Sequence, residues 1–208
     1  MSVYPELDEL SLPELIQRFL GPPLNGKTSA TAYYMEVAAR IGEQGNDGMR
    51  FLKEQVDRVA DDEPRLRAVM LGLMTPGLTD PWVERFLLAR LGDRRPAIVM
   101  EAIVDLTALQ TLAAHDQMRA LAAHRSPYVR GAVLRYLGAL FPMEAKPLLL
   151  AGLTDRHFVV RESAVDALDE MNAVDTIDAI RPLRNDAHPH VRQAAEWAVE
   201  HLGTPVLE

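Results

Sequence analysis

One segment of the chain matches a sequence motif for phosphate binding. Residues 21–28 begin with Gly21 and end with Gly26, Lys27 and Thr28, and so fit the expression G-x-x-x-x-G-K-[ST]. In a working loop of this kind, backbone N–H groups hold the phosphates, the lysine reaches the terminal phosphates and the hydroxyl residue binds magnesium. The motif makes nucleotide binding through Lys27 and Thr28 one candidate function.

The surrounding residues favour a structural loop instead. A phosphate-binding loop follows a buried β-strand, whereas residues 15–20 continue a helical pattern that Ser11 and Pro13 open. We therefore expect residues 21–28 to connect two helices, with Thr28 or Ser29 capping the second one.

The histidines have metal-binding chemistry, but their spacing favours structural roles. His157 and His188 are separated by 31 residues, a period at which other residues of the chain also recur. Stacked helix pairs stand roughly 10 Å apart, which one metal ion does not easily bridge without further ligands. We expect turn and capping roles for these residues and for His190, no metal site and no bound cofactor.

Catalytic side chains do not stand out elsewhere. The chain contains no cysteine, which excludes thiol catalysis, disulfides and zinc sites built on thiolates. No serine or threonine lies in a recognisable nucleophile motif. The sequence therefore favours a non-enzymatic role over catalysis and predicts no catalytic residue.

Composition narrows the classes of partner. The chain has 208 residues and a formal net charge of −8, which argues against broad binding to a nucleic-acid backbone. Its first ten residues are acidic rather than signal-like, and its apolar runs are shorter than a membrane span. We expect a cytoplasmic protein that binds neither nucleic acid nor membrane.

A period of 31 residues organises most of the chain. The dipeptide Val-Arg occurs at residues 129–130, 160–161 and 191–192, and its earlier equivalents are residues 66–67 and 98–99. In four of these five repeats an aspartate precedes the second residue of the pair by six positions; these are Asp61, Asp93, Asp155 and Asp186. A fixed period of this length is typical of a solenoid built from repeated units.

Each repeat is predicted to be an antiparallel pair of helices. Apolar residues follow the spacing i, i+3, i+4, i+7 in the second segment of each repeat, as in Val129, Ala132, Val133 and Tyr136. The first segments are residues 47–60, 81–91, 112–124, 142–153 and 174–183, and an earlier pair covers residues 11–20 and 29–41. We predict an all-α, right-handed α-solenoid of about six helix pairs.

This solenoid is expected to form one domain over residues 1–208. Residues 1–44 fit the period least well and are expected to be an N-terminal cap pair, as terminal repeats are often atypical. Residues 45–203 are the regular repeats, and residues 204–208 are a tail.

The pattern of an aspartate, an aliphatic-arginine pair six residues later and an Ala/Leu-rich helix resembles the HEAT repeat. The short period is similar to the HEAT-like repeats of phycobilisome lyase subunits. This resemblance implies that the aspartates lie in turns and that the arginines lie on second helices, which line a concave surface. It also implies one alternative function, attachment or handling of a bilin or another tetrapyrrole.

The aspartate and arginine series is interpreted as a set of structural ion pairs between repeats. Two positions interrupt it: Val99 replaces an arginine and His124 replaces an aspartate. Because the residues left over lie in adjacent repeats, we predict that Asp93 pairs with Arg130.

The remaining candidates lie opposite the buried stripe of the second helices. Two columns are expected there, and their small or apolar N-terminal members give way to charged C-terminal ones. The first column is Met35, Ala68, Met100, Gly131, Glu162 and Gln193, and the second is Ala39, Gly72, Val104, Arg135, Asp166 and Trp197. Adaptable methionines suit a partner-binding groove, but the same methionines would also fit in the core, and the sequence does not distinguish the two. The candidate partner-binding residues are Met35, Met100, Val104, Arg135, Glu162, Asp166 and Trp197.

We favour a non-enzymatic scaffold or adaptor that binds another protein or a peptide segment on its concave face. The tetrapyrrole-handling protein and the nucleotide-binding protein are the alternatives. The sequence does not determine the oligomeric state.

Overall fold

The computed structural model describes residues 4–24, 29–74 and 80–204. Within these ranges every regular element is helical, and none is a strand. The chain divides into two compact units, unit 1 over Met1–Arg90 and unit 2 over Leu91–Glu208, each described here by itself. The all-α solenoid predicted from the period is confirmed, whereas its handedness and its extension as one domain stay predictions.

The described residues of unit 1 form one short 3₁₀-helix and five α-helices. These are η1 (Pro5–Leu7), α1 (Leu12–Leu20), α2 (Ala30–Glu43), α3 (Gly45–Gln55), α4 (Glu63–Leu73) and α5 (Pro81–Arg90). Helix α2 packs against α1, α3 and α4. At the start of α1, the backbone N–H of Ser11 donates to the Glu14 carboxylate at 2.9 Å, which satisfies a donor that the helix leaves free.

Edge-to-face aromatic contacts fill the core between the first helices. The Phe19 ring lies 6.1 Å from that of Tyr34 and 5.8 Å from that of Phe51. Phe19 and Tyr34 are buried, so these pairs add a preferred geometry to the burial of apolar surface.

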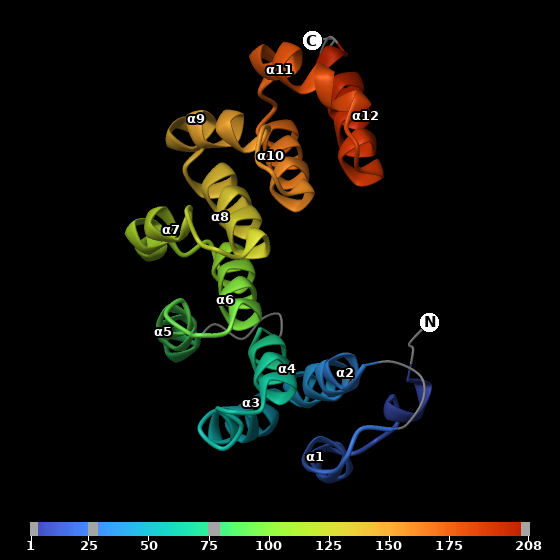
Figure 1. The fold of residues 1–208 in the computed structure, drawn as a ribbon. Coiled ribbons are helices and arrows are strands. Elements are labelled where there is room, and N and C mark those ends of the chain that lie inside the picture. The colour runs from blue at the N-terminus through green and yellow to red at the C-terminus, as the bar shows by residue number, and fades with distance from the viewer. Residues whose placement is uncertain (1–3, 25–28, 75–79, 205–208) are drawn as a thin grey trace. The chain divides into compact units, whose positions relative to one another are not determined.

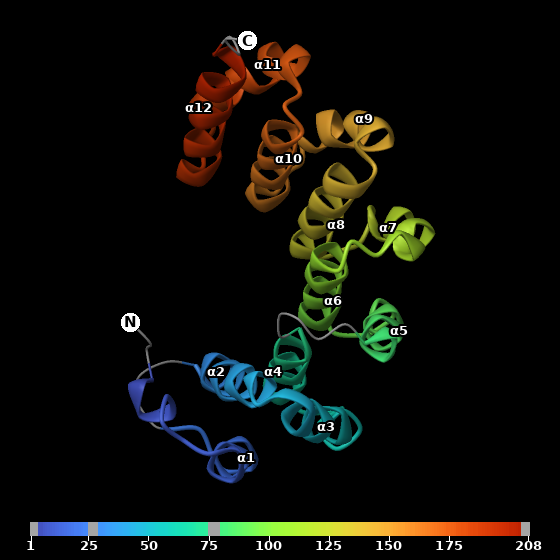
Figure 2. The same ribbon diagram turned by 180° about the vertical axis from the view of Figure 1, so that it is seen from behind.

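Unit 2 consists of two layers of helices. The inner layer contains α6 (Pro96–Ala108), α8 (Pro127–Leu140), α10 (Phe158–Glu170) and α12 (Pro189–Gly203). The outer layer contains α7 (His115–Leu121), α9 (Pro142–Gly152) and α11 (Ile177–Ile180), with the 3₁₀ segments η2 (Leu112–Ala114), η3 (Val174–Thr176) and η4 (Arg181–Asn185). Successive inner helices pack against each other, as both ribbon views show (Figures 1 and 2).

The predicted apolar stripe forms the core of this unit. Val129, Ala132, Val133 and Tyr136 are all buried on α8. Glycine allows the inner helices to approach closely, since a Cβ added at Gly138 would lie 3.1 Å from Cβ of Ala167 on α10. Because this stripe buries one face of each inner helix, the faces on the other side of successive inner helices lie next to one another.

Candidate partner-binding face

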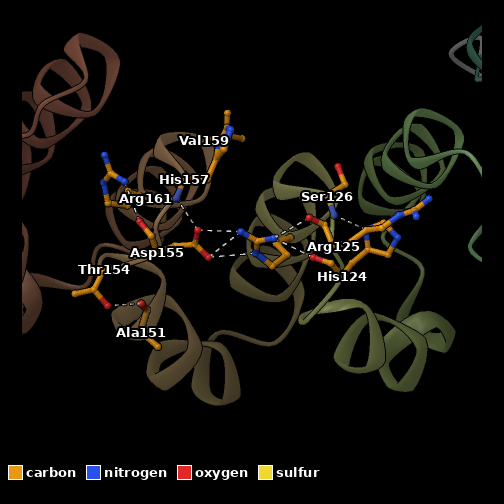
Figure 3. Close-up of polar contacts among 10 residues, drawn as sticks. His124, Arg125, Ser126, Ala151, Thr154, Asp155, His157, Val159 and Arg161 are labelled. Carbon is orange, nitrogen blue, oxygen red and sulfur yellow. Dashed lines mark hydrogen bonds and ion pairs between the residues drawn. The ribbon is translucent and has the colours of Figure 1, made fainter.

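Two ion pairs tie the inner helices of unit 2 to the turns that follow them. Nη2 of Arg130 lies 2.9 Å and 3.0 Å from the two carboxylate oxygens of Asp155, and Nε lies 3.2 Å from one of them. Arg161 holds Asp186 in the same way, with both contacts at 2.7 Å. Figure 3 shows Asp155 in the turn before α10, with dashed contacts to the arginine of α8 and to His157. Each pair joins one repeat to the next.

The predicted pair between Asp93 and Arg130 is wrong. Asp93 contacts the guanidinium of Arg95 at 2.8 Å, and Arg130 is bound to Asp155. The physical reason is direction: Arg130 and Arg161 each reach the aspartate 25 residues ahead, not the one behind. Val99 and His124, which are also 25 residues apart, therefore replace both members of one pair together.

The same aspartates also hold the turns that lead into α10 and α12, whose N-cap residues are His157 and His188. Backbone N–H groups of His157 and His188 each donate to the aspartate two residues earlier, at 2.8 Å. The His157 side chain itself caps α10, because its Nδ1 accepts from the backbone N–H of Val159 at 3.3 Å. The capping role predicted for His157 is confirmed, while His188 stacks on Phe158 with ring centroids 3.5 Å apart. No group of three potential metal ligands gathers among the described residues.

Four residues at equivalent positions of the inner helices make up what we term the inner column. These residues are Val104 on α6, Arg135 on α8, Asp166 on α10 and Trp197 on α12. Val104 is 45% exposed and Trp197 is 62% exposed, so neither end is used by the core. The column changes from an apolar end through a charged centre to an aromatic end.

The charged centre is electrostatically unbalanced. The pKa of Asp166 is raised to about 6, mainly by burial and also by the charge of Glu162, and Arg135 only partly opposes this shift. Arg135 itself donates to the Ser163 hydroxyl at 3.0 Å, a neutral acceptor. Asp166 is therefore a carboxylate without a matching cation close enough to restore its ordinary pKa.

The structure brings most of the predicted site residues together but not all of them. Glu162 lies beside the inner column, with an oxygen 3.9 Å from Nδ1 of His190, and Met100 is half-buried on α6. Met35 is half-buried on α2, which belongs to unit 1. Three further positions expected on this face are buried instead: Ala68, Gly72 and Gly131.

Sequence reasoning missed two residues of this face. Ser163 is buried and holds Arg135 in place, and His190 lies beside Glu162. The sequence could have indicated Ser163, because this position has a serine where the two neighbouring repeats have Ala132 and Ala194.

The segment that matches the phosphate-binding motif follows a helix, not a strand. Lys27 and Thr28 lie outside the described residues. The Gly21 carbonyl accepts from the Tyr34 hydroxyl at 2.9 Å and from Nη2 of Arg65 at 2.8 Å, which anchors the start of the loop to α2 and α4. The next helix is capped by Ser29, whose hydroxyl oxygen accepts from the backbone N–H of Ala32 at 3.2 Å. The predicted role of Ser29 is confirmed.

Comparisons with known proteins agree with this architecture. Residues 116–200 match the family model for HEAT repeats. An engineered protein of known crystal structure superposes with a TM-score of 0.59 at 14% identity, covering 92% of this chain and 96% of the other. A designed armadillo repeat protein matches with a TM-score of 0.50 at 17% identity, covering 92% of this chain and all of the other.

A second designed armadillo repeat protein, solved in complex with the peptide (KR)4, matches with a TM-score of 0.51 at 16% identity. That match covers 93% of this chain and 100% of the other. No curated protein matches the chain. None of the described helices combines the length and apolar character needed to cross a membrane.

Proposed function

We propose that the protein, whose residues 116–200 match the family model for HEAT repeats, is a non-enzymatic scaffold that binds a protein segment along the inner column. The observation that carries this proposal is the row of Val104, Arg135, Asp166 and Trp197 on successive inner helices, with large apolar side chains exposed at both ends. Solenoids use such continuous surfaces for binding.

The charges of the inner column favour a partner segment of mixed character. A cationic side chain placed against Asp166 would supply the positive charge that Arg135 supplies only in part. An apolar residue would cover Val104, and Trp197 would accept either an apolar or a cationic side chain on its ring face. A structural neighbour solved with the basic peptide (KR)4 is consistent with a peptide partner for this fold.

Tryptophan is also the residue type that most often dominates binding energy at protein interfaces. Trp197 is 62% exposed in this chain, so its burial by a partner would remove a large apolar surface from water. We therefore assign Trp197 the role of main anchor and the charged centre the role of setting register and orientation.

The test begins with affinity purification from the native host, with the full chain as bait. Candidate partners are then purified and their binding to the chain is measured by calorimetry. Trp197→Ala and Val104→Asp should each weaken binding by about tenfold or more. Met143→Asp is the matched control, since Met143 is 91% exposed on α9 in the outer layer.

Two results would contradict the proposal. One is a partner whose affinity is changed by Met143→Asp but not by Trp197→Ala, because this would place the interface on the outer layer. The other is a purified chain that carries a bound chromophore in its absorbance spectrum and captures no protein, which would favour the tetrapyrrole-handling alternative.

A further inference from the structure

Arg192 on α12 occupies the repeat position of Arg130 and Arg161, but its surroundings differ. The two earlier arginines are mostly buried, with side chains 13% and 14% exposed, and each holds a carboxylate. Arg192 is exposed, and its only hydrogen-bond partners among the described residues are two backbone carbonyls.

The backbone contacts hold the guanidinium of Arg192 in the orientation seen in the earlier repeats. Nη1 of Arg161 donates to the Asp155 carbonyl, six residues before it, at 2.8 Å. Nη1 of Arg192 donates to the Asp186 carbonyl, also six residues before it, at 2.8 Å, and to the Ala187 carbonyl at 3.0 Å. Nη1 is thus used in the same way, which leaves the edge formed by Nε and Nη2 for a ligand.

The earlier repeats indicate which ligand fits that edge. In Arg161, Nε and Nη2 each bind one oxygen of the Asp186 carboxylate at 2.7 Å. This fork matches the planar geometry of a carboxylate, and an arginine whose guanidinium is already oriented loses little freedom on binding one.

The ion pair does not require the close, glycine-lined helix contact that α8 makes with α10. Gly131 and Gly138 face α10 from α8, where an added Cβ would lie 2.7 Å from the Ser163 hydroxyl and 3.1 Å from Ala167. At the equivalent positions α12 has the exposed residues Gln193 and Glu200. Helix α10 has Glu162 and Asp169 at the same positions, and Arg161 still binds Asp186 across its junction with α12. A turn can therefore present a carboxylate to such an arginine without a glycine-lined contact between the helices.

From these observations we propose that Arg192 is a docking site for an acidic turn of a partner protein. Nε and Nη2 bind the carboxylate of that turn in the arrangement that Arg130 makes with Asp155. This site is separate from the inner column and does not depend on the function proposed for it.

The probe is a blocked peptide that copies residues 153–159, which include the turn that presents Asp155 to Arg130. It is titrated into the ¹⁵N-labelled full chain, and the arginine Nε–H signals are followed by NMR. The Arg192 signal should shift with a saturable dose response, while those of Arg130 and Arg161, already paired, should not. The peptide with Asp155→Asn should bind about tenfold more weakly, because one charge-assisted pair is lost.

Arg192→Lys serves as the variant, since it keeps the charge and removes the fork. Its unfolding transition checks that the fold is intact, and its affinity for the aspartate peptide should fall to that of the asparagine peptide. The proposal is overturned if both peptides shift the Arg192 signal equally, or if neither does at millimolar concentration. A stronger response to inorganic phosphate than to the aspartate peptide would also overturn it, by indicating a general anion site.

Discussion

Arg130 and Asp155, which belong to successive repeats, form a two-pronged ion pair whose closest contact is 2.9 Å. The arginine lies on α8 and the aspartate lies in the turn that leads into α10. One carboxylate therefore joins two helices and fixes the turn between α9 and α10. Arg161 and Asp186 repeat this arrangement one period later, so the ion pair belongs to the stacking of repeats.

This relationship predicts a specific energetic coupling. In a double-mutant cycle with Arg130→Gln and Asp155→Asn, urea unfolding should give an interaction free energy of about 1–2 kcal/mol, because the hydrogen bonds are charge-assisted and partly buried. The matched control is the cycle of Arg130 with Asp93, which share no contact in unit 2. Its coupling should stay below about 0.5 kcal/mol, and a larger value would contradict the pairing described here.

The same aspartates should make unit 2 sensitive to acid. Hydrogen bonds from Arg161 hold the pKa of Asp186 below its ordinary value. Burial opposes the shift at Asp155, but hydrogen bonds from Arg130 and from the His157 backbone leave its pKa lowered as well. A lowered folded-state pKa contributes stability above the unfolded value near 3.9, and this contribution is lost as the pH falls through the folded-state pKa.

The variant Asp155→Asn/Asp186→Asn should therefore be less stable than the wild type at pH 6 and should approach it in stability below about pH 3. Urea unfolding across this range measures the difference. A difference that did not shrink with acid would mean that packing, not charge, sets the role of these two residues.

The sequence predicted the helices well because each repeat needs one apolar stripe, and the period places that stripe visibly. It did not predict the direction of the ion pairs, since Asp93 and Asp155 both lie in repeats adjacent to that of Arg130 and the period alone does not say which of them the arginine reaches. It also predicted one helix over residues 174–183, where the structure has three short helical segments, η3, α11 and η4. Pro182 explains part of this break, as proline lacks the N–H that a continuing helix needs.

The candidate face was harder to predict than the fold. A single sequence sets the rotation of a helix about its axis only loosely, so exposed and buried positions one step apart are easily exchanged. Val104 and Trp197 are exposed as expected, but Gly131 is buried against Ser163. The polar contact of Arg135 with Ser163 depends on how α8 and α10 stack, which the spacing of residues does not reveal.

Close packing between α2 and α3 gives a further prediction. A Cβ added at Gly48 would lie 1.7 Å from the carbonyl oxygen of Ile41, a backbone atom that cannot rotate away. Gly48→Ala should therefore destabilise the protein by about 3 kcal/mol, at the upper end of the usual cost of overpacking. Gly203→Ala is the control, because nothing lies within 4 Å of a Cβ at that position. If thermal unfolding showed the same loss of stability for both variants, the close contact of Gly48 with the backbone of α2 would be contradicted.

Asp105 on α6 is a buried carboxylate that should weaken the fold at neutral and alkaline pH. The residue is 6% exposed, and its Oδ2 has no hydrogen-bond partner among the residues that the structure describes. Its pKa is raised to about 7, mainly by burial and also by the charge of the nearby Glu101. Because the folded state keeps a proton that the unfolded state releases near pH 4, stability should fall as the pH rises from 4 to 7.

Asp105→Asn keeps the shape of the side chain and removes the charge, so it should abolish this loss. At pH 8 the variant should be more stable than the wild type by up to about 4 kcal/mol, which is three pKa units of linkage, and near pH 4 the two should be almost equal. Asp116→Asn is the control, since the side chain of Asp116 is fully exposed on α7. An equal change in stability at both pH values would contradict this prediction. It would mean that the Asp105 carboxyl does not titrate between pH 4 and pH 8 in the folded protein.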